Sequence, residues 1–489
     1  MTLQNRGYPI RRRSLFGLGA GLLLAGIAQH AHGYTDAVSA KLTAKQRSRQ
    51  LLPAPAGMTP LLSYFDTAGP AVIRMRQGQR FHARLENGLL GGNLQEPTTI
   101  HWHGLRIPNA MDGVPFLTQA PVEPGDAFEY EFTPPSPGTF FFHPHCDTVN
   151  QLGQGLAGVL IVAGDEKCPF DADLVCAYRD WRINDDGSFA AMMTDKGAAT
   201  AGTFGKLQTV NDLVQPVFKV PAGGDIRVRF LNLDMARLID LGVENASGGP
   251  GAWMIAIDGN ALADPIELDT WRMGPAMRLD LAFRAPSRPG ERVRLMNYYA
   301  AEPVLLATFE ATGDVYQRRD FQPDFLMVPD LPEPKLDGVE AWPLRLGAAS
   351  APSPLPADLK LPDGTRLPSV SSLCLSPHVF WALNGNTWPT VQQGHLPPPL
   401  ATLTRDQTYV LELINETPHP HPIHLHGHTF KVFASNKRKV TPHFADTTLV
   451  RPNERLKIGF VADNPGDWML HCHIIEHQET GMMGYVRVT

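Results

Sequence analysis

Short runs of apolar or alternating apolar and polar residues follow one another from residue 60 onward, separated by Pro-Gly and Asn-Gly turns. Residues 128–132, 226–233 and 457–461 are examples. Alternation over so few residues is typical of strands, and few windows have the longer period of a helix. The pattern therefore predicts an all-β fold built from sandwiches or barrels.

Length and composition divide the chain further. At about 150 residues per domain, 489 residues suggest three domains. The predicted domains span residues 50–170, 171–330 and 369–489, with the Pro- and Ala-rich stretch 331–368 as a linker.

Two histidine motifs occur twice, in the same order. Residues 101–104 (HWHG) recur as 424–427 (HLHG), and 143–145 (HPH) recur as 471–473 (HCH). The motifs are 42 residues apart in the first copy (101 to 143) and 47 in the second (424 to 471). Residues 172–330 contain no histidine. We interpret this pattern as a duplicated unit in which the outer domains share a site and the middle domain is a spacer.

The histidine pairs have the spacing of metal ligands. On a strand, residues i and i+2 point to the same face, so each pair directs two imidazoles to one place. Imidazole suits copper, zinc, iron and nickel alike. Cys472, together with His421, His477 and Met482, favours copper among these metals. Two histidines, one cysteine and a weak axial methionine form the blue-copper arrangement.

With these motifs the chain resembles the multicopper oxidases of the three-domain, laccase-like bacterial type. The motifs are HWHG at 101–104, HPH at 143–145, HPIHLHGH at 421–428 and HCHIIEHQETGMM at 471–483. The resemblance implies three cupredoxin-like Greek-key domains and four copper ions per chain. It also implies one-electron oxidation of a reductant at a type 1 copper, coupled to reduction of dioxygen to water.

The resemblance also assigns the ligands of each copper. Type 1 would take His421, Cys472, His477 and axial Met482. Type 2 would take His101 and His424. The two type 3 ions would take His103, His143 and His473, and His145, His426 and His471 respectively.

Further residues have weaker assignments. Asp112 matches a family acid that orients water and relays protons beside the cluster, although an Asp-Gly turn is the alternative. Many bacterial relatives place an acid directly after the second type 1 histidine, where this chain has Gln478. Glu476 and Glu479 are possible substitutes, but on a predicted strand their side chains point elsewhere.

The remaining histidines and cysteines are expected to play lesser parts. His82, His419, His428 and His443 are more typical of solvent-exposed or supporting residues than of ligands. Cys146 is expected to be a small buried residue, Cys374 has no obvious partner, and a Cys168–Cys176 disulfide is an even alternative to two free thiols.

The substrate is less constrained than the chemistry. We favour phenols and aromatic amines, which need an open groove at the histidine edge of the blue site. The alternative is a metallo-oxidase acting on Mn(II), Fe(II) or Cu(I). Cu(I)-oxidising members of the family often carry a methionine-rich insertion in the third domain. This sequence has no methionine between Met327 and Met469, which argues against Cu(I) as the dedicated substrate. A copper-free structural relative in envelope assembly or cell division, and a plain copper store, are alternatives from other classes.

The N-terminus predicts export. Residues 1–33 combine Arg6, Arg11, Arg12 and Arg13 with a short apolar run, which resembles a signal peptide for the twin-arginine translocase and predicts a periplasmic protein. That run is too short for stable membrane insertion. The formal net charge of −6 supplies no basic field for nucleic acid.

Overall fold

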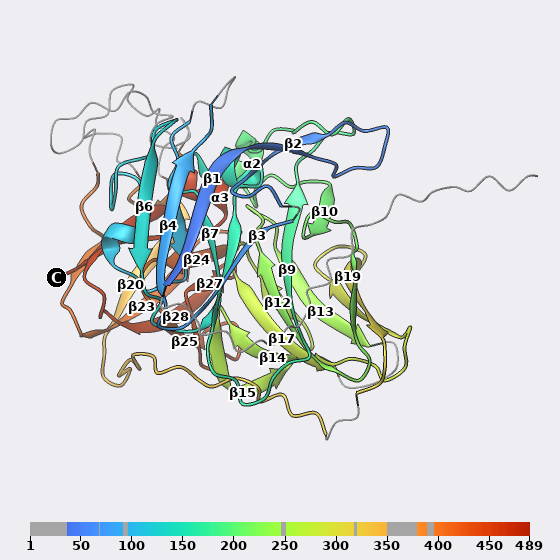
Figure 1. Cartoon of the computed structure of the whole chain (residues 1–489). Helices are drawn as coiled ribbons and strands as arrows, with labels where there is room; N and C mark the ends of the chain where they lie inside the picture. Colours follow the sequence, from blue (N-terminus) through green and yellow to red (C-terminus); the bar gives the residue numbers. More distant parts are fainter. Residues whose placement is uncertain are drawn as a thin grey trace, which may run out of the picture. The chain divides into compact units, whose positions relative to one another are not determined.

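Strands form nearly all of the regular structure, because alternating apolar side chains bury one face of each ribbon (Figure 1). The computed structural model describes residues 37–67, 69–90, 96–245, 251–316, 320–349, 379–388 and 396–489. The prediction of an all-β fold is confirmed. The predicted signal at 1–33 and Cys374 lie outside the described residues.

The first part of the chain forms two four-stranded sheets, ordered β2-β1-β4-β6 and β3-β8-β7-β5. Their elements are β1 (Ala37–Arg49), β2 (Thr59–Ser63), β3 (Ala71–Arg76), β4 (Arg80–Asn87), β5 (His101–His103), the 3-10 turn η1 (Asn109–Met111), β6 (Ala127–Phe132), β7 (Gly138–His143), α1 (Thr148–Gly153) and β8 (Gly158–Ala163). Strand β1 pairs with β4, so this sheet begins before the predicted boundary at residue 50.

The middle part forms sheets ordered β10-β9-β12-β17-β14-β15 and β11-β19-β18-β13-β16. Its elements are β9 (Ala172–Trp181), α2 (Asp195–Ala198), β10 (Leu207–Val210), β11 (Val217–Pro221), β12 (Asp225–Asn232), β13 (Ile239–Asn245), β14 (Trp253–Ile257), β15 (Asn260–Glu267), β16 (Trp271–Met273), β17 (Arg278–Arg284), β18 (Arg292–Asn297) and β19 (Val304–Thr312).

The last part forms sheets ordered β21-β20-β23-β28-β25-β26 and β22-β30-β29-β24-β27. Its elements are β20 (Ala341–Ala348), β21 (Trp381–Leu383), β22 (Ala401–Leu403), β23 (Thr408–Asn415), β24 (His421–Leu425), β25 (Phe430–Ser435), β26 (His443–Ala445), β27 (Thr447–Val450), β28 (Arg455–Val461), β29 (Gly466–Cys472), α3 (Ile475–Glu479) and β30 (Met483–Val488). The predicted linker 331–368 is wrong where β20 lies, because β20 pairs with β23 inside this sheet.

The three parts pack as one unit that spans residues 36–489. One large core cluster joins buried side chains of the middle and last parts, such as Phe230 and Trp468. A second cluster, around Trp102 and Phe142, fills the first part. None of the described helices has the length and apolar character needed to cross a membrane.

Candidate metal centre

Two equivalent strand pairs bring the repeated motifs together. In the first part, β5 pairs with β7 so that His101 lies opposite His143. In the last part, β24 pairs with β29 so that His424 lies opposite His471. The duplicated sequence thus produces a duplicated register, and each register places two histidine motifs side by side.

The two registers meet in a buried cluster of eight histidines, the histidine cluster. Its members are His101, His103, His143, His145, His424, His426, His471 and His473. The imidazoles of the two repeats stack crosswise: His101 on His426 with ring centroids 3.8 Å apart, and His103 on His424 at 3.7 Å. The outer parts therefore share one site, as the sequence predicts.

Ligand atoms within the cluster converge in three all-histidine groups, each within 4.8 Å, and two of these groups share His103. The groups are His101 with His103 and His424, His103 with His143 and His473, and His145 with His426 and His471. The last two match the predicted type 3 sets, and the first contains the predicted type 2 pair.

Unpartnered ring nitrogens show that the cluster fits metal ions. Within the histidine cluster, the buried ring nitrogens without a hydrogen-bond partner are Nε2 of His101, His143, His145 and His424, Nδ1 of His103 and both ring nitrogens of His473. An unpaired buried polar atom destabilises a fold, so a set of them aimed into one space indicates a missing partner. Imidazole lone pairs suit copper.

Burial holds seven of the cluster's imidazoles in the neutral form, as metal ligation requires. Desolvation lowers the pKa of His471 to about 3. It also lowers the pKa of six others well below the usual value, namely His103, His143, His145, His424, His426 and His473.

The four residues predicted as type 1 ligands, here called the blue site, are His421, Cys472, His477 and Met482, and Cys472 lies in the sequence between His471 and His473 of the cluster. Cys472 Sγ lies 3.6 Å from His421 Nδ1 and 3.7 Å from His477 Nδ1, and the two nitrogens are 3.1 Å apart. Two nitrogens each about 2 Å from a tetrahedral centre lie at about this separation. Met482 is fully buried, and its carbonyl accepts a hydrogen bond from the Cys472 amide at 3.0 Å.

Two aspartates orient the cluster in a repeated way. The Asp112 carbonyl faces His101 Nδ1 at 2.8 Å, and its carboxylate faces His426 Nδ1 at 2.9 Å. The Asp446 carbonyl faces His424 Nδ1 at 2.7 Å, and its carboxylate faces His103 Nε2 at 3.1 Å. Each aspartate thus fixes one imidazole of its own repeat and one of the other. Sequence analysis missed Asp446, although its equivalence to Asp112 in the repeat is a signal that could have found it.

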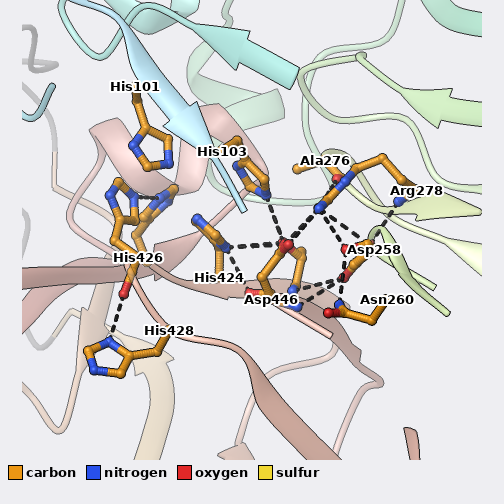
Figure 2. Close-up of polar contacts among 12 residues, drawn as sticks. His101, His103, Asp258, Asn260, Ala276, Arg278, His424, His426, His428 and Asp446 are labelled. Atoms are coloured by element: carbon orange, nitrogen blue, oxygen red, sulfur yellow. Dashed lines mark hydrogen bonds and ion pairs between the residues drawn. The ribbon is translucent and has the colours of Figure 1, made fainter. Parts of the chain in front are cut away.

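The middle part of the chain supplies the support for Asp446. Figure 2 shows Arg278 in polar contact with both Asp446 and Asp258. Arg278, fully buried on β17, donates to the Asp446 carboxylate at 2.7 and 2.5 Å, and its backbone amide donates to Asp258 at 2.8 Å. The expectation that the middle domain is only a spacer is therefore wrong.

Comparison with known proteins places this geometry in a family. Models of multicopper oxidase domains match residues 65–167 and 374–489. The crystal structure of a multi-copper oxidase from Pseudomonas thermotolerans is 34% identical, covers 93% of this chain and 100% of that chain, and gives a TM-score of 0.78. The chain is a multicopper oxidase.

Other relatives agree with this assignment. The multi-copper oxidase structure from Pseudomonas parafulva is 34% identical over 92% of this oxidase and 99% of that chain, with a TM-score of 0.77. Multicopper oxidase MmcO of Mycobacterium tuberculosis is 27% identical and covers 96% of this chain and 95% of its own length. Laccase-1 of Fomitopsis schrenkii is 29% identical, with 84% and 80% covered.

The acids near the second blue-site histidine lie on a helix, not on the expected strand. Helix α3 buries Gln478, whose Oε1 has no hydrogen-bond partner in the described structure. Glu479 turns toward α1 and accepts a hydrogen bond from the Val149 amide at 2.8 Å. Glu476 turns the other way, toward Thr203 of the middle part. Neither glutamate occupies the position of Gln478.

Other histidines of the oxidase stand outside the ligand groups. His428 is buried, and its Nδ1 contacts the His426 carbonyl at 3.1 Å, so it supports a ligand. His82 pairs with Glu129 on the surface, and His443 faces the Thr441 carbonyl. His419 lies beside Trp381 at the blue-site wall.

Of the two alternatives for Cys168 and Cys176, a disulfide or two free thiols, the structure has the free thiols. Buried Cys146 is also a free thiol. Cys176 points into the core of the middle part, whereas Cys168 packs in a separate apolar cluster around Phe325. The two side chains pack in different apolar clusters, so the sulfur atoms do not meet although the residues are close in sequence.

Proposed function

We propose that the oxidase holds four copper ions and couples one-electron oxidation of a reductant at the blue site to reduction of dioxygen at the histidine cluster. The blue site would hold the type 1 ion, His101 and His424 the type 2 ion, and the two remaining histidine groups the type 3 pair. The convergence of unpartnered imidazole nitrogens in the cluster carries this proposal. Copper ions held there would supply redox steps that side chains do not provide.

The chain itself connects the two sites. Cys472 belongs to the blue site, while its neighbours His471 and His473 belong to the cluster, so one strand end spans both. Four reductant equivalents each lose one electron, and these four electrons with four protons convert one dioxygen molecule to two waters. Asp112, fully buried against His101 and His426, is the acid we propose to relay protons there.

Oxygen uptake tests the proposed function. Copper-loaded protein should consume oxygen when given a methoxyphenol, Fe(II), Mn(II) or Cu(I), and the order of kcat/KM values should identify the reductant class. An Asp112→Asn variant should lose about ten- to a hundredfold in turnover, as is typical when a residue supporting metal ligands is changed. Zinc-loaded protein is the control. Bound copper without oxygen uptake for any reductant would instead indicate a copper store.

We further propose export through the twin-arginine translocase to the periplasm, supported by Arg12 and Arg13 before the apolar run. A variant with both arginines changed to lysine should accumulate in the cytoplasm while the parent protein reaches the periplasm. Cell fractionation and immunoblotting measure this. Equal periplasmic amounts of the two proteins would contradict twin-arginine export.

A further inference from the structure

Residues 194–203 of the middle part, here called the cap, cover the outward edge of the blue site. His477 is completely buried, and its Nε2 donates a hydrogen bond to the Thr200 carbonyl at 2.7 Å. Because a carbonyl only accepts, Nε2 carries the ring proton, and Nδ1 is left facing Cys472. The carbonyl therefore occupies the position from which a docked reductant would bond to this histidine.

Both walls of the blue site hold the cap. On one side, Trp381 Nε1 donates to the Ala198 carbonyl at 2.6 Å, and the indole lies 4.4 Å from the His477 ring. On the other side, the buried Glu476 carboxylate accepts hydrogen bonds from the Thr203 amide at 2.5 Å and the Thr203 hydroxyl at 3.0 Å. Charge-assisted bonds of this kind are stronger than neutral ones.

The cap is also closed on itself. The Thr194 hydroxyl accepts from the Gly197 amide at 3.0 Å and begins helix α2, and the Thr194 amide donates to the Thr203 hydroxyl at 2.9 Å. Beside the C-terminal end of the cap, Arg182 is paired with Asp234 and donates to the Thr203 carbonyl at 2.8 Å. The two ends of the cap are thus tied together and anchored to a buried ion pair.

Two glycines let the cap approach this closely. A Cβ on Gly202, which has a φ of +103°, would lie 2.4 Å from the Ala236 Cβ. A Cβ on Gly197 would lie 2.1 Å from the Thr203 hydroxyl and 2.9 Å from the Glu476 carboxylate. Only glycine fits at either position, so the sequence of the cap is adapted to a closed state.

We propose that the cap determines which reductants this oxidase accepts, an inference that rests on the proposed function. A phenol oxygen can accept the His477 Nε2 hydrogen bond only where the Thr200 carbonyl leaves that hydrogen free, which the cap prevents, and the proton that a phenol loses with its electron passes to solvent. A small metal complex loses an electron and no proton, so it needs no hydrogen bond to His477. The structure thus favours small metal-centred reductants over bulky phenols, in contrast to the preference stated from the sequence.

Shortening the cap tests this inference. The hydroxyls of Thr194 and Thr203 lie 3.0 Å apart, so two glycines can replace residues 195–202 while Thr194, Thr203 and the bonds of Thr203 to Glu476 and Arg182 remain. In the copper-loaded protein, the ratio of kcat/KM for syringaldazine to that for ferrocyanide should rise about tenfold or more. The blue absorption and copper EPR signals should stay, since no blue-site ligand changes.

A point variant covers the case in which the shortened chain does not fold. Thr203→Val removes the hydroxyl that bonds Glu476 and Thr194, and should raise the same ratio to a smaller extent. The matched control is Thr312→Val, which removes a hydroxyl bonded to the Val220 carbonyl on a distant sheet and should leave the ratio unchanged.

Hydrogen exchange gives a readout independent of turnover. The amides of Gly197, Ala198, Thr200, Gly202 and Thr203 all donate within the structure, so exchange in this segment of the parent protein should be slow. Fast exchange there, or an unchanged ratio in both cap variants, would overturn the inference. Failure of the parent holoenzyme to consume oxygen with either reductant would overturn the proposed function itself, whatever the exchange rates.

Discussion

A Cys472→Ser variant should fold, yet lose the blue absorption and about a thousandfold or more of oxidase turnover, which corresponds to about 4 kcal/mol or more of activation free energy. The thiol is fully buried between His421 and His477, and burial raises its pKa, so only a bound metal ion holds it as thiolate. A serine hydroxyl of similar size fits the space but supplies no thiolate ligand.

The histidine cluster should survive this substitution, because its eight imidazoles do not include residue 472. Cluster copper, measured by metal analysis and the type 2 EPR signal, should therefore remain. The matched control is Cys176→Ser, a free buried cysteine on β9 in the core of the middle part. It should cost about 1–3 kcal/mol of stability for an unpaired hydroxyl while keeping colour and turnover. Full oxidase activity in Cys472→Ser would contradict the blue-site assignment.

The ligand groups could be predicted from the sequence because the information is local. Each His-x-His motif lies at or just beyond a strand, and the duplicated order pairs β5 with β7 and β24 with β29 in the same register. Strand pairing then fixes which histidines are neighbours. Residue type and spacing are sufficient for such a site, and the whole fold only has to bring its two halves together.

The supporting residues could not be predicted because their contacts join distant parts of the chain. Arg278 meets Asp446 across 168 positions, and Thr200 meets His477 across 277. The middle part has no histidine, so a search for ligands passes over it, although it supplies both contacts. Nothing in the neighbouring sequence distinguishes a buried arginine on a strand of alternating residues from an exposed one.

The local structure also differs from the prediction in two places where tertiary contacts outweigh the local sequence pattern. Residues 475–479 follow a strand but form helix α3, whose Ile475 amide bonds the Met235 carbonyl of the middle part. The proline-rich stretch around residue 343 has the composition of a linker. Pro343 nevertheless lies in strand β20, which pairs with β23. Such contacts are set by the assembled sheets and not by composition.

Arg278→Met should destabilise the oxidase by about 3–5 kcal/mol, because the substitution leaves two buried carboxylates without their cation. Arg278 and Asp258 are fully buried and Asp446 is nearly so, and burial together with Asp446 raises the pKa of Asp258. Denaturant unfolding of the copper-free protein measures the loss. We also expect cluster copper to fall, since Asp446 faces His103 and His424 only while Arg278 holds it in place.

A matched control separates these two effects. Arg227 on β12 forms a comparably buried pair with Asp280 at 2.5 Å, and no contact of this pair reaches a ligand histidine in the described structure. Arg227→Met should therefore lower the free energy of unfolding but keep the type 2 EPR signal and the near-ultraviolet type 3 absorption. Arg278→Met with both signals intact would show that the Arg278–Asp446 pair serves stability alone.

A double variant separates the effect on stability from the effect on copper binding. In Arg278→Met with Asp446→Asn, one of the two unpaired buried charges is gone, so part of the lost stability should return. The neutral amide oxygen accepts a weaker hydrogen bond than the carboxylate, and without Arg278 it is no longer held toward His103, so the cluster signals should not return with it. Stability would then rise from the single to the double variant while copper binding stays low, which a purely structural role for Arg278 does not predict.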